Sequence, residues 1–259
     1  MALEDGLKID IRRKKILEML SRDGQVRVTQ LSEVLGTTVV TIRNDLASLE
    51  RDGYCERIPG GALQTVKNFY NMDFQLRKQE HMPFKKAIAA AVTELVQDGE
   101  TLLINSGTTT YYTAIELKRR KNLSIVTNSI SIAIELGSYP TFRVKLLGGE
   151  INSQYAFSYG NDAMSQLRRY KADKVILSVD GVSCANGLTT YHAEEAAINE
   201  VMMERARQTI IVADYTKLGH ESFFNFGEIG GADFCVTNSC ADTLLLQQMK
   251  GCGVEIIKA

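Results

Sequence analysis

The segment VTQLSEVLGTTVVTIRNDLASLE, residues 28–50, decides the architecture of the N-terminal part of the chain. A short apolar stripe of Leu31, Val34 and Leu35 predicts one helix that buries these side chains, with Thr29 as its N-cap. Gly36 supplies the tight turn after that helix. Apolar side chains then return at helical spacing, at Val39, Ile42, Leu46 and Leu49. The segment therefore predicts two helices joined by a glycine turn.

The second of these helices carries a polar face, which includes Arg43 and Asn44, and Thr37 or Thr38 is expected to cap it. A helix that lies in the major groove of DNA needs such a face, because arginine and asparagine reach the edges of guanine and adenine there. The pattern also fits a structural three-helix subdomain with a solvated polar face. The residues alone favour the first interpretation, a helix-turn-helix.

Elements on either side complete the module. A helix is expected at Arg12–Ser21, a short strand at Val26–Val28, and two further strands at Tyr54–Ile58 and Ala62–Val66. The Pro-Gly-Gly turn between the strands predicts a wing, where Arg57 and the open amides of Gly60 and Gly61 would meet phosphates. Overall charge gives this interpretation no support. The net charge is −1, and residues 1–66 hold ten basic and ten acidic side chains.

From Phe84 onward, apolar strand-like runs alternate with helical patterns, which predicts an α/β domain with a mostly parallel sheet. The strands are expected at Thr101–Asn105, Leu123–Asn128, Arg143–Leu147, Lys174–Asp180, Thr209–Asp214, Asp233–Asn238 and Val254–Lys258. The helices are expected at Thr109–Lys118, Ser129–Leu136, Asn161–Tyr170, Ala193–Gln208 and Ala241–Met249. The predicted division is a DNA-binding domain at 1–66, a linker at 67–83 and a second domain at 84–259.

Composition excludes several classes of protein. No apolar run approaches the roughly 18 residues of a membrane helix, and the charged N-terminal residues lack the apolar core of a signal peptide. We therefore expect a cytoplasmic protein that does not bind a membrane. The five cysteines form no C-x-x-C pair, so we expect free thiols and no metal site.

The segment 103–110 predicts a strand, a hydroxyl-rich turn and the start of a helix. Backbone amides at a helix N-terminus favour anions, and Gly107 lets a ligand come close to the backbone. The turn lacks the lysine and the spacing of a nucleotide-binding loop. Simple N-capping by Ser106 or Thr108 would also explain these residues.

Polar turns follow the other predicted strands too. They contain Asn128-Ser129, Gly148-Gly149, Asp180-Gly181, Thr189-Thr190 before Glu194 and Glu195, and Asp214 with Lys217. The carboxyl ends of parallel strands share one edge of a sheet, where ligands bind. These turns should therefore converge on one site, in which Lys217 supplies the cation that an anionic ligand needs.

A run of about fifty residues carries a more specific set of motifs. They are Ile16-Leu17, Val28-Thr29-Gln30-Leu31, Thr41-Ile42-Arg43, Asp45-Leu46, Leu49-Glu50, Gly53, and Arg57 with Gly60-Gly61-Ala62. This run resembles the DNA-binding module of the DeoR family of bacterial sugar-metabolism regulators. The chain departs from the family pattern at Thr37-Thr38, where Val-Ser is usual, at Asn44, where arginine is usual, and at Pro59, where histidine is common.

The C-terminal half carries further motifs. They are Asn105-Ser106-Gly107-Thr108-Thr109-Thr110, Val126-Thr127-Asn128-Ser129, Leu147-Gly148-Gly149, Asp180-Gly181, Gly187-Leu188-Thr189-Thr190, Glu194, and Ala213-Asp214 with Lys217. They resemble the DeoR-type sensor domain, whose fold is similar to ribose-5-phosphate isomerase and glucosamine-6-phosphate deaminase. The resemblance implies a phosphorylated sugar on the Ser106–Thr110 loop and a homodimer or homotetramer. The family commonly has aspartate in place of Asn105 and serines in place of Tyr215 and Thr216.

These observations predict a transcription regulator, a repressor of a carbohydrate-utilisation operon, that binds double-stranded operator DNA under the control of a sugar-phosphate effector. The predicted DNA contacts are Thr38, Val40, Thr41, Arg43, Asn44, Arg57, Gly60 and Gly61. The predicted effector contacts are Ser106, Gly107, Thr108, Thr109, Thr110, Asn128, Ser129, Gly148, Gly149, Asp180, Gly181, Thr189, Glu194 and Lys217. No catalytic residue, metal or cofactor is expected. The alternatives are a sugar-phosphate isomerase or deaminase with an accessory N-terminal module, and an architectural DNA-binding protein without a ligand.

Overall fold

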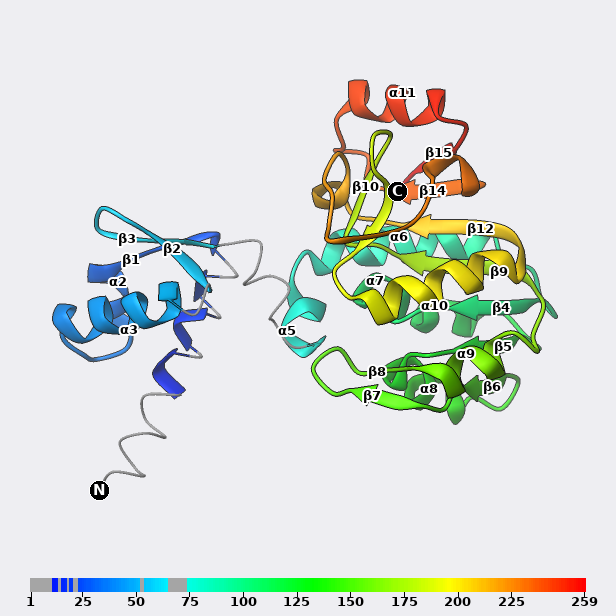
Figure 1. Ribbon diagram of the computed structural model, residues 1–259, viewed down its shortest axis with the longest axis horizontal. Coiled ribbons are helices and arrows are strands. Elements are labelled where there is room, and N and C mark those ends of the chain that lie inside the picture. The colour runs from blue at the N-terminus through cyan, green and yellow to red at the C-terminus, as the bar shows by residue number, and fades with distance from the viewer. Residues whose placement is uncertain (1–10, 14, 18, 21–22, 52–53, 65–73) are drawn as a thin grey trace. The chain divides into compact units, whose positions relative to one another are not determined.

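The computed structural model describes residues 11–13, 15–17, 19–20, 23–51, 54–64 and 74–259. The chain divides into two compact units, residues 1–80 and 81–259 (Figure 1). The helix end predicted at Gly53 and residues 67–73 of the predicted linker lie outside the described residues. The rest of that interval contains helix α5 (Phe74–Gln79) and the beginning of helix α6 (Met82–Glu94).

The N-terminal unit has the predicted order of elements. Its described elements after a helical segment within positions 11–20 are β1 (Gln25–Arg27), α2 (Val28–Val34), α3 (Val39–Arg51), β2 (Cys55–Ile58) and β3 (Gly61–Gln64). The strands form an antiparallel sheet in the order β1-β3-β2. The helices pack on a core that includes Ile16, Leu20, Leu31, Ile42 and Leu46, each at most 1% exposed. Val34 was expected in this core but is 62% exposed, because the last turn of α2 faces solvent at that position.

One capping prediction in this unit is wrong. Helix α2 begins at Val28, one residue before Thr29, and its N-cap residue Arg27 makes no side-chain capping bond. The Val28 N–H instead donates to the carbonyl oxygen of Gly60 at 2.9 Å. The wing turn therefore supplies the acceptor that Thr29 was expected to provide.

A seven-stranded sheet, parallel throughout, forms the centre of the C-terminal unit. Its strands are β4 (Thr101–Ile104), β5 (Ser124–Thr127), β6 (Arg143–Leu146), β9 (Ala172–Ser178), β12 (Ala206–Val212), β14 (Phe234–Thr237) and β15 (Glu255–Lys258). Their order is β15-β14-β12-β9-β4-β5-β6. All seven correspond to predicted strands, and the predicted α/β fold class is confirmed.

Helices cover both faces of this sheet. They are α6, α7 (Thr108–Glu116), α8 (Ile130–Gly137), α9 (Asn161–Leu167), α10 (Ala193–Glu204) and α11 (Thr243–Gly251). Alternate residues of each strand point to opposite faces. Leu102 and Ile104 belong to a core shared with α6, α7 and α8, whereas Leu103 belongs to one shared with α9, α10 and α11. In Figure 1, α10 crosses in front of β9 and β4.

Short antiparallel strands, none of them predicted, surround the ends of the sheet. They are β7 (Glu150–Asn152), β8 (Phe157–Tyr159), β10 (Gly181–Ser183), β11 (Gly187–Thr190) and β13 (Phe224–Gly227). Strands β10 and β11 form a hairpin, and β13 pairs with β11. Helix α10 ends four residues before the predicted Gln208, because the sequence from Ala206 onward enters the central sheet as β12.

The expectation of free thiols is wrong for two of the five cysteines. Cys184 and Cys252 form a disulfide, whereas Cys55, Cys235 and Cys240 are free. The two partners are 68 positions apart, and only the folded chain brings them together. In the described residues, no group of three His, Cys, Asp or Glu side chains is placed to hold a metal ion. None of the described helices is both long and apolar enough to cross a membrane.

Candidate DNA-contacting surface and effector site

Helix α3 buries one side and exposes the other. Ile42 and Leu46 lie in the core of the unit. On the opposite side Val40 is 65% exposed, and Arg43 and Asn44 are exposed as well. The predicted recognition residues therefore form one solvent-facing surface on a helix whose other side is fixed by packing.

The start of α3 is held by a threonine cap. The Thr41 N–H donates to the Thr38 hydroxyl at 3.1 Å, and the two threonine hydroxyls lie 2.9 Å apart. The sequence left the cap open between Thr37 and Thr38, and this bond assigns it to Thr38. The Ser32 hydroxyl donates to the Thr37 carbonyl at 2.5 Å, which ties the turn back to α2.

A buried ion pair fixes α3 against the first helix. The Asp45 side chain is almost fully buried and accepts hydrogen bonds from Arg12 Nε at 2.5 Å and Nη2 at 3.1 Å. Arg13 Nε donates to the same carboxylate at 3.3 Å. The hydrogen bond to Asp45 raises the pKa of Arg12 above its ordinary value. Asp45 was noticed only as part of a motif, and the structure shows that it positions the recognition helix.

The wing turn places its two glycines differently. Gly60 has a φ of +82° and is exposed, and its carbonyl oxygen holds the start of α2. Gly61 is buried in the sheet, where an added Cβ would lie 2.0 Å from a carbonyl oxygen of β1. The side chain of Arg57 is 43% exposed, with Nη1 3.9 Å from a carboxylate oxygen of Glu50. Gly60 and Arg57 therefore lie where a phosphate can reach them, whereas Gly61 has a packing role.

The second group of predicted residues lies at the carboxyl ends of adjacent strands. Strands β12, β9, β4, β5 and β6 are consecutive neighbours in the sheet. The turns after them contain Lys217, Asp180, Ser106, Asn128 and Gly148, respectively. The parallel sheet thus gathers these five turns at one edge, as expected for a ligand site in such folds.

The turn between β4 and α7 requires a glycine. Gly107 has a φ of +155°, and an added Cβ would lie 1.8 Å from the Ser178 hydroxyl of β9. The fully buried Thr110 hydroxyl donates to the carbonyl oxygens of Asn105 and Gly107, at 3.0 and 3.1 Å. Thr110 therefore holds the turn closed, and the amides at the start of α7 follow directly after Gly107.

A buried polar network connects this turn to strand β11, to helix α10 and to the turns after β5 and β9. The Ser106 N–H donates to Asn128 Oδ1 at 3.0 Å, and the Ser106 hydroxyl donates to Glu195 Oε1 at 2.8 Å. The Thr190 hydroxyl lies 2.9 Å from Glu195 Oε2 and 3.1 Å from Asp180 Oδ2. Ser106, Asn128, Asp180, Thr190 and Glu195 are each at most 9% exposed. The network brings together three predicted residues and adds two, Thr190 and Glu195.

Asn105 anchors the network to β9 and α10. Its side-chain amide donates to the carbonyl oxygen of Ser178 and to Asn199 Oδ1, both at 3.0 Å. Its side-chain oxygen accepts from the Ser178 N–H at 2.9 Å. A carboxylate cannot donate the first two bonds. The asparagine at this position, where the family commonly has aspartate, therefore matches its surroundings in this chain.

The two glutamates at the start of α10 have different positions. Glu194, the predicted contact, is exposed, whereas Glu195 is buried in the network. Glu150 and, to a smaller extent, Glu194 raise the pKa of Tyr159, because nearby carboxylates disfavour a phenolate. Helical spacing could have predicted that Glu195 is buried, since it lies on the same side of α10 as the buried Ile198 and Met202.

Four other predicted contacts have structural roles that the residues alone did not distinguish. The Ser129 hydroxyl caps α8 by accepting from the Ile132 N–H at 3.3 Å. An added Cβ on Gly149 or Gly181 would lie 2.3 or 2.6 Å, respectively, from a backbone oxygen. The Thr189 hydroxyl donates to the Gly181 carbonyl at 3.0 Å. These residues shape the turns that carry the network.

Two predicted residues lie at the margins of the strand edge. Gly148 is exposed, and its N–H donates to the Gln166 side chain at 3.1 Å. Lys217 is half-buried in a short 3₁₀ helix (Tyr215–Lys217) after β12. Asp214 caps this turn by accepting from the N–H and the hydroxyl of Thr216. Lys217 follows β12 and Asp180 follows β9, and these two strands are neighbours in the sheet.

An aromatic cluster adjoins the network. The rings of Tyr155 and His192 meet edge to face with centroids 4.5 Å apart. His192 also contacts Tyr191, whose N–H donates to Asp180 Oδ2 at 3.0 Å. These residues come from the loop between β7 and β8 and from the turn before α10.

A separate cavity of about 730 Å³ lies at the tip of the β10–β11 hairpin. Cys184, Asn186, Glu221, Phe223 and Cys252 are among its lining residues. Of the predicted effector contacts it includes only Thr189, and the turn after β4 has no part in it. The convergent polar groups lie in the network at the strand edge, which is the candidate effector site, and this cavity is distinct from it.

A winged helix-turn-helix joined to a parallel α/β unit with a polar site at its strand ends defines a class of protein, the ligand-sensing transcription regulators. Residues 12–67 match the model of the DeoR-like helix-turn-helix domain, and residues 80–239 match that of the DeoR C terminal sensor domain. The chain belongs to the DeoR family, as the motifs predicted, and is a DNA-binding transcription regulator.

Relatives along nearly the whole chain are named as regulators. The HTH-type transcriptional regulator GlpR of Haloferax volcanii is 31% identical over 95% of this chain and 96% of its own. The glycerol-3-phosphate regulon repressor of Escherichia coli is 29% identical over 91% of this chain and 93% of its own. Since the family and these relatives are regulators, the alternative of an isomerase or deaminase is not supported.

Among solved structures, the chain is similar to ribose 5-phosphate isomerase from Plasmodium falciparum. The identity is 17% and the TM-score 0.38, with 51% of each chain covered. A likeness at this level says nothing about activity.

Proposed function

We propose that this regulator is a repressor of a carbohydrate-utilisation operon and that a phosphorylated sugar, bound at the strand edge, sets its affinity for operator DNA. The names of its relatives support a role in carbohydrate metabolism. The proposed effector site comprises the turn Ser106–Thr110, the network and Lys217. Residues 1–66 form the DNA-binding domain, 84–259 form the sensor and oligomerisation domain, and 67–83 connect them.

The observation that carries this proposal is the pairing of the turn after β4 with a buried carboxylate. The turn brings the amides of an α-helix N-terminus to the strand edge, where an anion is favoured. Its Ser106 hydroxyl is held by Glu195 rather than by the helix that it precedes. Simple N-capping therefore does not account for Ser106, and a phosphate arriving at the turn would compete with Glu195 for that hydroxyl.

The sugar would lie against the rest of the network. Asp180 accepts hydrogen bonds in this structure and can accept them from sugar hydroxyls. Lys217 supplies positive charge from the neighbouring strand end. A dimer or tetramer would place paired winged helices on an inverted repeat, since the symmetry of the protein matches that of its site. Sedimentation as a monomer at concentrations that bind the operator would contradict this assembly.

A thermal-shift panel tests the effector site. It compares phosphorylated sugars and sugar alcohols with their unphosphorylated counterparts on the full chain. A true effector at about 100 times its Kd stabilises the folded state by about 2.7 kcal/mol, and only the phosphorylated form should do so. Equal stabilisation by both forms would place the ligand away from the turn after β4.

Two matched variants localise the response. Thr109→Val removes a hydroxyl from the first turn of α7, and Thr113→Val removes one from the next turn, where it donates to the Thr109 carbonyl. We expect Thr109→Val to weaken the phosphorylated effector by about tenfold, the effect of one lost hydrogen bond to a charged group. Thr113→Val should leave the affinity unchanged, and equal losses in both variants would contradict the proposed site.

A further inference from the structure

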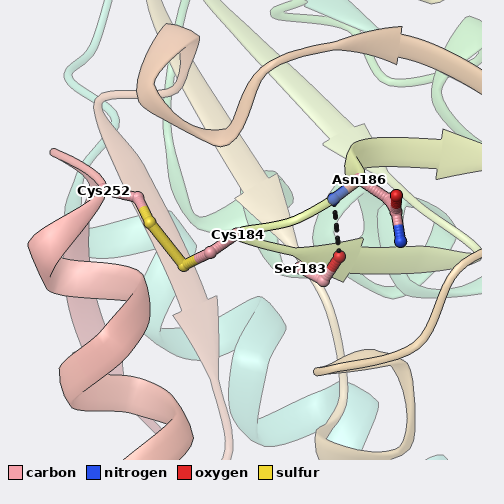
Figure 2. Close-up of a disulfide and its surroundings, with 4 residues drawn as sticks. All are labelled: Ser183, Cys184, Asn186 and Cys252. Carbon is pink, nitrogen blue, oxygen red and sulfur yellow. Dashed lines mark hydrogen bonds between the residues drawn. A yellow bond between two sulfur atoms is a disulfide. The ribbon is translucent and has the colours of Figure 1, made fainter.

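The disulfide between Cys184 and Cys252 joins two parts of the sensor unit that are distant in sequence (Figure 2). Cys184 lies in the turn of the β10–β11 hairpin, where the Asn186 N–H donates to the Ser183 hydroxyl at 3.1 Å. Cys252 is the C-cap residue of α11. Their Cα atoms are 6.3 Å apart, within the range that a disulfide spans without moving the backbone.

This disulfide is open to reagents in solution. Cys184 is exposed, Cys252 is half-buried, and both line the 730 Å³ cavity at the hairpin tip. The other cysteines differ: Cys55 and Cys235 are buried, and burial raises the pKa of their thiols to about 11 and about 12. The disulfide pair is therefore more accessible to thiol exchange than these two buried cysteines.

The hairpin connects this disulfide directly to the polar network. Its ladder pairs Ser183 with Gly187 next to the cysteine and Gly181 with Thr189 at the other end. Asp180 immediately precedes the hairpin, and Thr190 is its last residue. Both side chains belong to the network around Glu195. A cross-link at the tip therefore restrains the two strands whose base carries network residues.

We propose that Cys184 and Cys252 form a reversible thiol–disulfide exchange site, whose reactant is a low-molecular-weight disulfide and whose state controls how firmly the hairpin holds the network. A regulator that binds DNA works where cellular thiols are normally kept reduced, and disulfides there are mostly transient or redox-sensing. The exchange site is inferred from the positions of the two cysteines and does not depend on the proposed function. Its influence on effector binding rests on the function proposed above.

The exchange balances with a single reactant. The Cys184 thiolate attacks one sulfur of the small disulfide RSSR, forming a mixed disulfide and releasing RS⁻. The Cys252 thiolate then attacks the Cys184 sulfur and releases the second RS⁻, so the protein loses two electrons and RSSR gains them. The two protons from the cysteines end on the released thiols. Cys184 acts first because it is more exposed, and because Cys252 lies at a helix C-terminus, which disfavours a thiolate.

Redox titration of the full-length protein tests the exchange site. The native protein is equilibrated in mixtures of reduced and oxidised glutathione, its free thiols are alkylated, and peptide masses report each cysteine. We expect Cys184 and Cys252 to change together and reversibly, passing from blocked to alkylated as reduced glutathione rises. A bond that stays closed in a large excess of reduced glutathione, or that never forms in oxidised glutathione, would overturn the proposal.

Hydrogen exchange tests the coupling without any effector. Reduction of the native protein should accelerate amide exchange across residues 181–190 by about tenfold, because the hairpin loses its restraint at the tip. Cys184→Ser and Cys252→Ser should show the fast rate in either buffer, whereas Cys240→Ser, which removes an exposed free thiol, should respond like the wild type. Unchanged exchange across the hairpin would overturn the coupling. Neither measurement uses a sugar phosphate, so failure of the effector panel would leave both results interpretable.

Discussion

Asn105 shows how one buried side chain can hold the turn after β4 in place. Its amide group bridges Ser178 on β9 and Asn199 on α10, and its own backbone carbonyl accepts from Thr110. Asn105, Thr110 and Asn199 are fully buried and Ser178 is half-buried. An unmatched donor or acceptor in the interior costs about 1–3 kcal/mol. The identity of residue 105 is therefore coupled to that of its neighbours.

The variant Asn105→Asp introduces the aspartate that the family commonly has at this position. The carboxylate would face the Ser178 carbonyl oxygen and Asn199 Oδ1 without a hydrogen to share. We expect the free energy of unfolding to fall by about 1–3 kcal/mol, measured by urea denaturation. Asn161→Asp is the matched control, because Asn161 is exposed in the first turn of α9, where aspartate is favoured. Unchanged stability of Asn105→Asp would mean that Asn199 rotates its amide to donate.

At this scale the sequence predicted residue types better than contacts. Ser106, Asn128 and Asp180 were all expected at the strand edge, and one network joins them. The motif alone did not show which side of α10 faces the interior, so it could not distinguish the buried Glu195 from the exposed Glu194. The pairing of Cys184 with Cys252 depends on tertiary packing alone.

Among the elements, α3 offers the most direct test of DNA recognition. Arg43 is exposed on the face opposite the core, so its replacement should not disturb the fold. Arg43→Ala should weaken operator binding by about 1–3 kcal/mol if it contacts a base. The measurement is fluorescence anisotropy of a labelled operator fragment at fixed salt.

The matched control is Arg119→Ala in the C-terminal unit, where Arg119 is 70% exposed and pairs only with its neighbour Glu116 among the described residues. It removes the same charge from the protein. Equal weakening by both variants would show that total charge, rather than a contact from α3, determines the affinity.

Long apolar runs and short polar strands differed in how well they could be predicted. The five inner strands β14, β12, β9, β4 and β5 each hold at least three consecutive buried residues, which makes their apolar runs easy to find. The edge strands β6 and β15 are partly exposed. The strands β7, β8, β10, β11 and β13 mix polar residues or glycine with apolar ones over three or four positions, so they show neither a continuous apolar run nor a sustained alternation. Helix α6 was missed because Pro83 was interpreted as the end of a linker, although proline is favoured in the first turn of a helix.

On the scale of the whole molecule, the proposed function requires the two units to be coupled. The effector must bind two arrangements of the sensor unequally, because a ligand with equal affinity for both shifts nothing. We expect a sugar phosphate from the thermal-shift panel to change operator affinity by about 5- to 150-fold, equivalent to about 1–3 kcal/mol. Anisotropy titrations at fixed salt, with the unphosphorylated sugar as control, measure this change. An operator affinity that stays constant at saturating effector would contradict the coupling.

The order of the units along the chain also matters during synthesis. The described core of the DNA-binding unit ends at Ala62, whereas the network is incomplete until Glu195 has been added. At about 5–20 residues per second, the ribosome needs roughly 7–27 s to cover that interval. For those seconds each nascent chain carries the described core of its DNA-binding unit, while the residues of the proposed effector site have not all been translated.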